Sequence, residues 1–145
     1  MPLRIDNEGE LREAQAALFN INSTAGWLLL NYVGPSTVHL AAGGDTGIEE
    51  MANLFDDDMI QYGLIRLVEP QAGDSLKSIV RDVFVTYVGS AVGIMEKNKK
   101  AAFLSDAQDL LQPFHAAITV LNRDGFNRET ILERSHSSSG NNVID

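Results

Sequence analysis

The order of apolar and polar residues along the chain predicts strands alternating with helices. Residues 27–33 form a run that is apolar almost throughout, and residues 59–68, 79–88 and 116–121 form three further, mainly apolar runs. Such runs are typical of strands buried on both faces of a sheet. A shorter run, residues 37–41, follows the first after a Gly-Pro-Ser turn signal, which favours a hairpin. The pattern therefore predicts five strands.

Helices are predicted where apolar residues recur every three or four positions. Leu11, Ala14 and Leu18 have this spacing, and Asn7 is expected to cap the helix that carries them. Three more helices are expected: one capped by Thr46 with Glu49, one over most of residues 90–114 with a polar interruption at 97–100, and one at 127–135. With a loop at residues 70–74, the expected order is αββαββαβα.

This alternation predicts an α/β (α+β) fold with one domain. Strands that are apolar on both faces need helices on both sides of the sheet. The length of 145 residues suits a single core. We expect the domain to cover residues 1–135. Residues 136–145 are expected to be a disordered tail, because the serine, glycine and asparagine that dominate it bury little apolar area.

Composition and charge narrow the class of protein. The chain has no cysteine, which excludes disulfides, cysteine-based zinc sites and a thiol nucleophile. Its net charge of −9 repels phosphate groups, so neither nucleic acid nor an anionic membrane is an expected partner. The first residues lack a signal-peptide pattern and no apolar run could span a bilayer. We expect a soluble, cytoplasmic protein.

The residue pattern does not predict catalysis or metal binding. The histidines His39, His115 and His136 are far apart and share no ligand spacing. The glycine-rich residues 43–47 lack the lysine of a phosphate-binding loop. The carboxylates at residues 56–58 lack the spacing of a calcium loop, and no serine lies in a nucleophile elbow. We therefore expect a binding protein without enzymatic activity or cofactor.

Two segments resemble the ADF-homology (actin-depolymerising factor/cofilin) family, and within it the coactosin group. They are residues 62–66, Tyr-Gly-Leu-Ile-Arg, and residues 81–89, Arg-Asp-Val-Phe-Val-Thr-Tyr-Val-Gly. Three further features occur in the same order as in this family: Trp27 in the first apolar run, the aspartates of residues 56–58, and Asn122-Arg123 after the last run. The likeness covers nearly the whole expected domain.

The resemblance implies a central mixed sheet of five strands with helices on both faces. It also implies a monomer that binds filamentous actin, regulates actin dynamics without catalysis and is found in the cytoplasm at the cytoskeleton. In this family the filament contacts involve the loop between the third and fourth of these strands, the basic residue that opens the fourth, the long helix and the last helix.

The same resemblance indicates which residues contact the filament. Arg81 stands where coactosins carry a lysine needed for filament binding. A guanidinium group can bind a carboxylate of the acidic actin surface with two hydrogen bonds. The other expected contacts are Lys77 in the preceding loop, Lys97, Lys99 and Lys100 before the long helix, Gln108 on that helix, and Arg128 and Arg134 on the last helix.

Three departures from the family pattern refine this expectation. The long helix carries Asp106 and Asp109 where severing cofilins are basic. Acidic groups facing an acidic partner repel it, so we expect weak binding of monomeric actin and little severing. Leu3 replaces the serine at which cofilins are switched by phosphorylation, and Ser78-Ile79 replaces a basic pair of coactosins.

Two alternative functions remain open from the sequence. The domain could bind the actin-branching complex, as glia maturation factor does, or a non-actin enzyme partner. It could also be a small-molecule-binding or hydrolytic α/β domain. A deep polar pocket that holds titratable residues would favour this second alternative.

Overall fold

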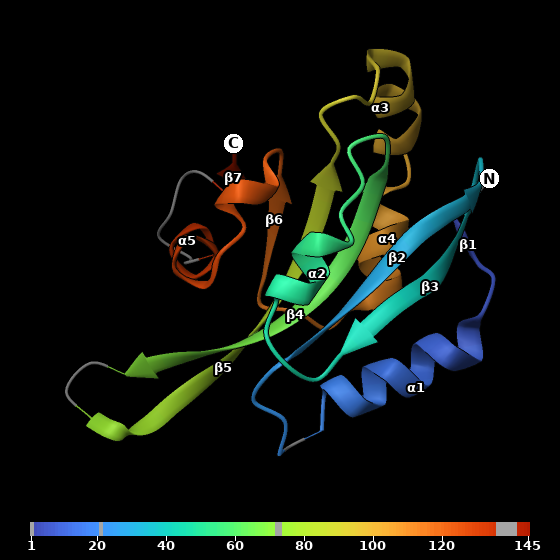
Figure 1. Cartoon of the computed structure of the whole chain (residues 1–145). Coiled ribbons are helices and arrows are strands. Elements are labelled where there is room, and N and C mark those ends of the chain that lie inside the picture. Colours follow the sequence, from blue (N-terminus) through green and yellow to red (C-terminus); the bar gives the residue numbers. More distant parts are fainter. Residues whose placement is uncertain (1, 21, 72–73, 136–141) are drawn as a thin grey trace.

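A seven-stranded mixed sheet forms the centre of the molecule (Figure 1). The computed structural model describes residues 2–20, 22–71, 74–135 and 142–145, and of residues 69–71 and 74–79 only the backbone. The described strands lie in the order β1-β3-β2-β4-β5-β6-β7. Their bounds are β1 Arg4–Ile5, β2 Gly26–Gly34, β3 Thr37–Gly44, β4 Ile60–Gln71, β5 Asp74–Val88, β6 Ala116–Val120 and β7 Val143–Ile144.

The two longest strands, β4 and β5, form an antiparallel hairpin. Ile60 pairs with Val88 near the body of the domain, and the pairing continues outward to Gln71 and Asp74, with a register shift after Pro70. Figure 1 shows the outer half of this hairpin projecting as an arm beyond the rest of the domain. The inner half of β5 pairs in parallel with β6, which makes the sheet mixed.

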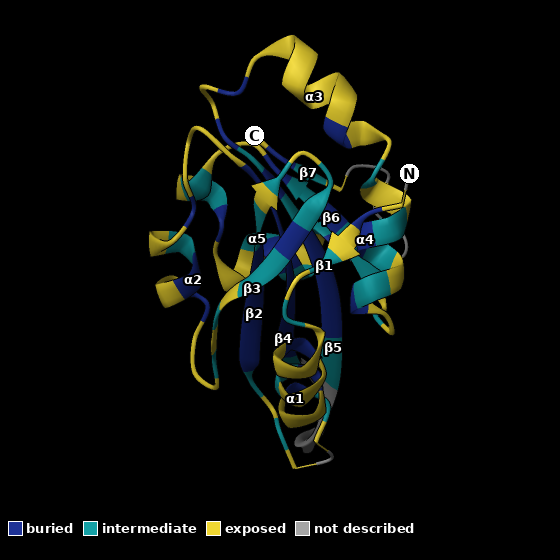
Figure 2. Cartoon of the chain, turned by 90° about the vertical axis from the view of Figure 1, so that its right-hand side faces the viewer, coloured by how far each residue is buried: buried dark blue, intermediate teal, exposed yellow. Residues whose placement is uncertain are grey.

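Helices cover both faces of the sheet, as the apolar strands predict. The helices are α1 (Glu8–Leu18), α2 (Glu49–Asn53), α3 (Ile94–Ala101), α4 (Leu104–Leu111) and α5 (Arg128–Arg134), with a 3-10 turn, η1, at Arg123–Gly125. Helices α1 and α4 pack on one face, and α2 and α5 on the other. Figure 2 shows that α3 stands at one end of the molecule and is exposed along most of its length.

The alternation of side chains along each strand divides the interior into two cores. Leu28 and Leu30 of β2 point to the core beneath α1 and α4, whereas Trp27 and Leu29 point to the core beneath α2 and α5. All four side chains are buried. Because neither face of β2 meets solvent from Trp27 to Leu30, this part of the strand reads as a continuous apolar run.

The number of strands differs from the prediction. The sheet has seven described strands instead of five, because β1 pairs in parallel with β3 and β7 pairs in parallel with β6. Strands of two residues are too short to show a hydrophobic period. Of the tail expected to be disordered, residues 136–141 lie outside the described residues, and Val143–Ile144 forms β7 with Ile144 buried.

Several element boundaries also differ. The expected loop at residues 70–74 is shorter, because β4 continues to Gln71 and β5 begins at Asp74. Helix α2 begins at Glu49 with Ile48 as its N-cap, so the capping box at Thr46 is wrong. The polar residues 97–100 lie inside α3, since lysine is a good helix former, and the helices separate at residues 102–103.

The first helix, α1, lies where the sequence predicts it, but the side chain of Asn7 does not cap it. Asn7 precedes α1, yet its side chain makes no capping hydrogen bond. The Asn7 amide oxygen accepts the backbone N–H of Leu40 at 2.8 Å, and its amide nitrogen donates to Glu10 at 2.9 Å. Asn7 therefore ties the start of α1 to strand β3.

A buried ion pair joins the two strands of the hairpin at its base. Arg66 of β4 donates two hydrogen bonds to the Asp82 carboxylate, at 2.7 and 2.9 Å. Its remaining guanidinium nitrogen donates to the carbonyls of Asn20 and Ser23, and the Phe19 ring lies 5.5 Å from its central carbon. The arginine is therefore fully engaged and fastens the loop after α1 to the sheet.

Candidate functional site

Most of the residues expected to contact actin fall into two groups, one beside the middle of β5 and one at its C-terminal end. Arg81, Arg128 and Arg134 lie near the base of the projecting hairpin, and the lysines of α3 lie where β5 ends at Val88. Arg81 and Val88 are seven positions apart, which corresponds to roughly 23 Å along an extended strand. One rigid sheet thus carries both groups.

Arg81 lies on the face of β5 that α5 covers. It is half-buried, and its guanidinium donates a hydrogen bond to the Ser135 carbonyl at 3.1 Å. Ser135 caps the C-terminus of α5, where the helix dipole favours a cation. The end of α5 therefore positions the arginine that the sequence identified as the first candidate contact.

The other end of α5 holds the neighbouring strand of the hairpin. Arg128, at the first position of α5, donates a hydrogen bond to the Val68 carbonyl of β4. Asn127 caps the helix by accepting the backbone N–H of Thr130 at 2.9 Å. Helix α5 thus contacts β4 through its start and β5 through its end, which fixes the base of the hairpin against the body.

Two more of the expected contacts, Arg134 and Lys77, lie on α5 and on β5. Arg134 is half-buried on α5, and its Nε has no hydrogen-bond partner among the residues that the structure describes. Lys77 was expected in a loop, but its backbone belongs to β5, four residues before Arg81 toward the tip. Its side chain lies outside the described part of the chain.

The lysines of α3 have two different environments. Lys97 and Lys99 are exposed, whereas Lys100 is the buried residue of this helix. The Lys100 ammonium donates to the Pro35 carbonyl at 2.8 Å and lies 4.0 Å from the centre of the Tyr32 ring. Lys100 therefore fastens α3 to the turn between β2 and β3, with Glu96 at 3.4 Å as a further partner.

Two tyrosines form the floor beneath this lysine. The hydroxyl groups of Tyr32 and Tyr62 share a hydrogen bond of 2.6 Å. Burial raises the pKa of Tyr62 above its usual value, and burial together with the hydrogen bond to Tyr62 raises the pKa of Tyr32. Both phenols therefore stay neutral at physiological pH and keep their shared hydrogen bond.

Helix α4 carries Gln108 and the two aspartates that depart from the family pattern. Gln108 is half-buried, and Asp109 is exposed. The Asp106 carboxylate accepts the backbone N–H of Leu3 at 3.0 Å. Asp109 is therefore the freely presented acidic group of this helix, while Asp106 holds the N-terminal segment.

A three-residue cluster connects segments that the sequence showed separately. The Asp57 carboxylate accepts hydrogen bonds from the Tyr87 hydroxyl at 2.7 Å and from Arg123 at 3.0 Å. Both bonds lower the pKa of Asp57, and the bond from Tyr87 has the larger effect. The pKa of Tyr87 is raised, mainly by burial and to a smaller extent by the hydrogen bond to Asp57. The aspartate run and the Asn-Arg pair were both visible in the sequence, but their contact was not.

The cavities of the molecule can be compared with the deep polar pocket that a small-molecule-binding or hydrolytic domain would need. An apolar groove beside α3 has a volume of about 230 Å³. A smaller hollow of about 100 Å³ has a mixed lining that includes Arg66 and Arg128, both of which already make hydrogen bonds. Within the described residues there is no cluster of histidine and carboxylate side chains that could hold a metal ion, and no helix long and apolar enough to span a membrane.

Comparisons of the sequence with family models and with known proteins point to the same family. Residues 5–136 match the family described as cofilin/tropomyosin-type actin-binding protein. Coactosin of Dictyostelium discoideum is 22% identical over 132 residues, which cover 90% of this chain and 88% of coactosin. The drebrin-like protein of Mus musculus is 25% identical over 137 residues, 94% of this chain, but the chain spans only 30% of that protein's length.

Solved structures show the same fold. Human coactosin-like protein superposes with a TM-score of 0.77 at 19% identity, covering 100% of this chain and 96% of the other. Coactosin from Entamoeba histolytica gives a TM-score of 0.72 at 17% identity, with 90% and 92% covered. These likenesses confirm the predicted ADF-homology fold, with its mixed sheet between two layers of helices.

Proposed function

The chain belongs to the family of cofilin/tropomyosin-type actin-binding proteins, and we propose that it binds the side of the actin filament in the cytoplasm. It acts there as a monomer without catalysis, binds monomeric actin weakly and severs little. Mouse coactosin, which has a similar solved structure, is described as an actin filament binding protein, and this supports the preference for filaments.

The position of Arg81 is the observation that carries this proposal. Arg81 lies at the base of the projecting hairpin, and α5 contacts both strands of that base, β4 through Arg128 and β5 through Ser135. A preorganised cation loses little conformational entropy when it meets a carboxylate, so more of the interaction energy remains as affinity. With a net charge of −9, the protein needs such local positive contacts to approach an acidic filament.

The acidic character of α4 supports weak binding of actin monomers. Asp109 is exposed on this helix, and the described part of α4 carries no basic residue that would balance it. A carboxylate that faces an acidic surface is repelled. The hairpin and α5 would then supply most of the attraction, and a surface that spans neighbouring subunits exists only in the filament.

Cosedimentation with filaments at two salt concentrations tests the proposal. The protein should pellet with filaments at low salt and less at high salt, because exposed ion pairs are screened. Monomeric actin should show little binding in the same buffer. A protein that stays in the supernatant beside abundant filaments at low salt would refute the proposal, and tight monomer binding would refute its preference for filaments.

A further inference from the structure

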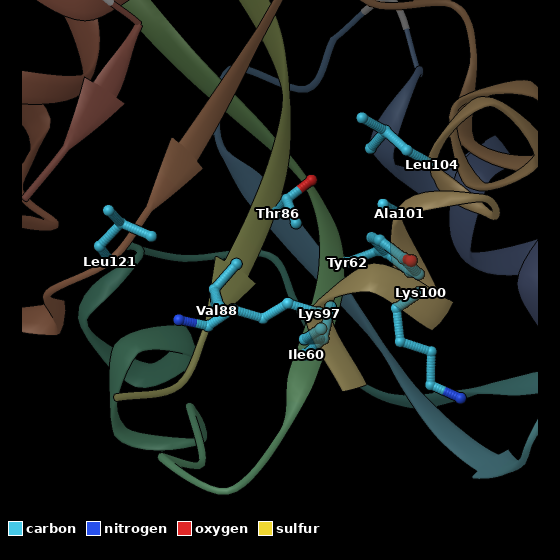
Figure 3. Close-up of a pocket in the computed structure, with 9 residues that line it drawn as sticks. All are labelled: Ile60, Tyr62, Thr86, Val88, Lys97, Lys100, Ala101, Leu104 and Leu121. Atoms are coloured by element: carbon cyan, nitrogen blue, oxygen red, sulfur yellow. The ribbon is translucent and has the colours of Figure 1, made fainter. Parts of the chain in front are cut away.

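The groove beside α3 is lined by apolar side chains from four parts of the fold. Ile60 of β4 and Val88 of β5 form its floor, Ala101 and Leu104 come from the junction of α3 and α4, and Leu121 follows β6 (Figure 3). Leu104 and Leu121 keep 39% and 42% of their surface exposed, so the groove is open to solvent. Its volume is about 230 Å³.

One charged group at this groove lacks a partner within the described part of the chain. Lys97 lines the groove and extends from α3 toward Val88 (Figure 3). It makes no hydrogen bond or ion pair with any residue that the structure describes. Lys100 also borders the groove, but its ammonium points away and is held by Pro35 and Tyr32. The groove thus offers an apolar surface with an available positive charge.

We propose that this groove binds an anionic amphiphile, a short alkyl carboxylate whose chain lies on the apolar floor and whose carboxylate pairs with Lys97. The apolar lining favours an alkyl chain, because each buried methylene contributes about 0.8 kcal/mol in transfer from water. The ammonium favours a negative head group over a neutral one.

The size of the groove sets the length of the ligand. If a methylene takes about the volume of a water molecule, about 30 Å³, the groove holds a chain of roughly seven or eight carbons. Octanoate therefore matches the space, and hexanoate leaves part of it empty. Lys97 is also one of the expected filament contacts, but this proposal does not rest on actin binding and its test contains no actin.

The experiment follows the amide signals of the intact protein by NMR while hexanoate or octanoate is added below the concentration at which micelles form. We expect the largest shifts at Val88, Ala101, Leu104 and Leu121. Octanoate should bind about fifteenfold more tightly than hexanoate, which corresponds to two methylenes at about fourfold each. The neutral octan-1-ol should bind more weakly than octanoate.

Variants separate the roles of the charge and the apolar floor. Lys97→Met keeps the length of the side chain and should weaken octanoate binding by about twofold to fivefold. Lys99→Met removes an equally exposed charge of α3 that does not line the groove, and should leave binding unchanged. Ala101→Phe places a ring in the groove from an exposed position and should abolish binding.

Several results would overturn the proposal. These are the absence of shifts at the groove up to the solubility limit of octanoate, equal affinity for hexanoate and octanoate, and equal weakening by Lys97→Met and Lys99→Met. Pelleting with anionic phospholipid vesicles without binding of soluble octanoate would also overturn it, and would indicate a membrane surface as the ligand.

Discussion

The guanidinium group of Arg81 donates a hydrogen bond to the carbonyl of Ser135, 54 residues further along the chain. This bond joins β5, the second strand of the projecting hairpin, to the C-terminal end of α5. It gives the cation a defined direction before any partner arrives. The strand and the helix that the resemblance named separately are therefore in direct contact in this protein.

Replacement of Arg81 should weaken filament binding more than it weakens the fold. Arginine hot spots at interfaces cost about 2 kcal/mol or more when truncated, which corresponds to an affinity loss of about thirtyfold. We expect Arg81→Ala to lower the fraction that pellets with filaments accordingly. Arg4→Ala is the matched control, because Arg4 is exposed on β1 at the opposite part of the sheet. Equal pelleting of both variants would remove Arg81 from the site.

The Arg66–Asp82 pair should be needed for stability rather than for binding. Both side chains are more than nine-tenths buried, and Asp82→Asn would leave the Arg66 charge without its partner. Such single replacements cost about 3–5 kcal/mol. The midpoint of urea unfolding should fall accordingly. The double variant Arg66→Met with Asp82→Leu should recover much of the loss, and a double variant as unstable as Asp82→Asn would contradict this interpretation.

Lys100 should hold α3 in place. Lys100→Met removes the hydrogen bond to Pro35 and the contact with the Tyr32 ring but keeps the aliphatic stem. A hydrogen bond from a charged group contributes about 1.5–3 kcal/mol. Amide hydrogens of α3 should therefore exchange with solvent at least tenfold faster in this variant. Lys99→Met, which alters an exposed neighbour, should leave the exchange rates of α3 unchanged; comparable acceleration in the two variants would argue against the role of Lys100.

The cluster of Asp57, Tyr87 and Arg123 should make stability depend on pH. The pKa of Asp57 is lowered in the folded protein, so its ionised form contributes stability above the usual carboxyl range, and this is lost as pH falls through the folded value. The pKa of Tyr87 is raised, so its neutral form contributes stability below about pH 10, and this is lost as pH rises further.

Replacement of Asp57 tests this dependence. Asp57→Asn should reduce the loss of stability between about pH 5 and pH 2, measured as the urea midpoint at each pH. Asp58→Asn is the control, because Asp58 is exposed and its side chain makes no hydrogen bond or ion pair among the described residues. A profile for Asp57→Asn that follows the wild-type profile through the acid range would show that the cluster does not contribute.

Much of the architecture follows from local patterns in the sequence. The apolar runs predicted β2, β4, β5 and β6, and the spacing of Leu11 and Leu18 predicted α1. These predictions succeed because strand and helix periods are repeated within a few residues. The two-residue strands β1 and β7 and the short helix α2 were missed or misplaced, because they contain too few residues to show a period.

The sequence by itself determined the layered fold and the family, since both depend on residue types and spacing along the chain, and Arg81 stays a prediction from the family resemblance. Only the tertiary structure decided that α5 positions Arg81, that Lys100 is buried against the turn between β2 and β3, and that Asp57 meets Arg123. These contacts join residues 54 to 66 positions apart. No local period encodes such distances; they arise when strand register and helix packing bring distant segments together.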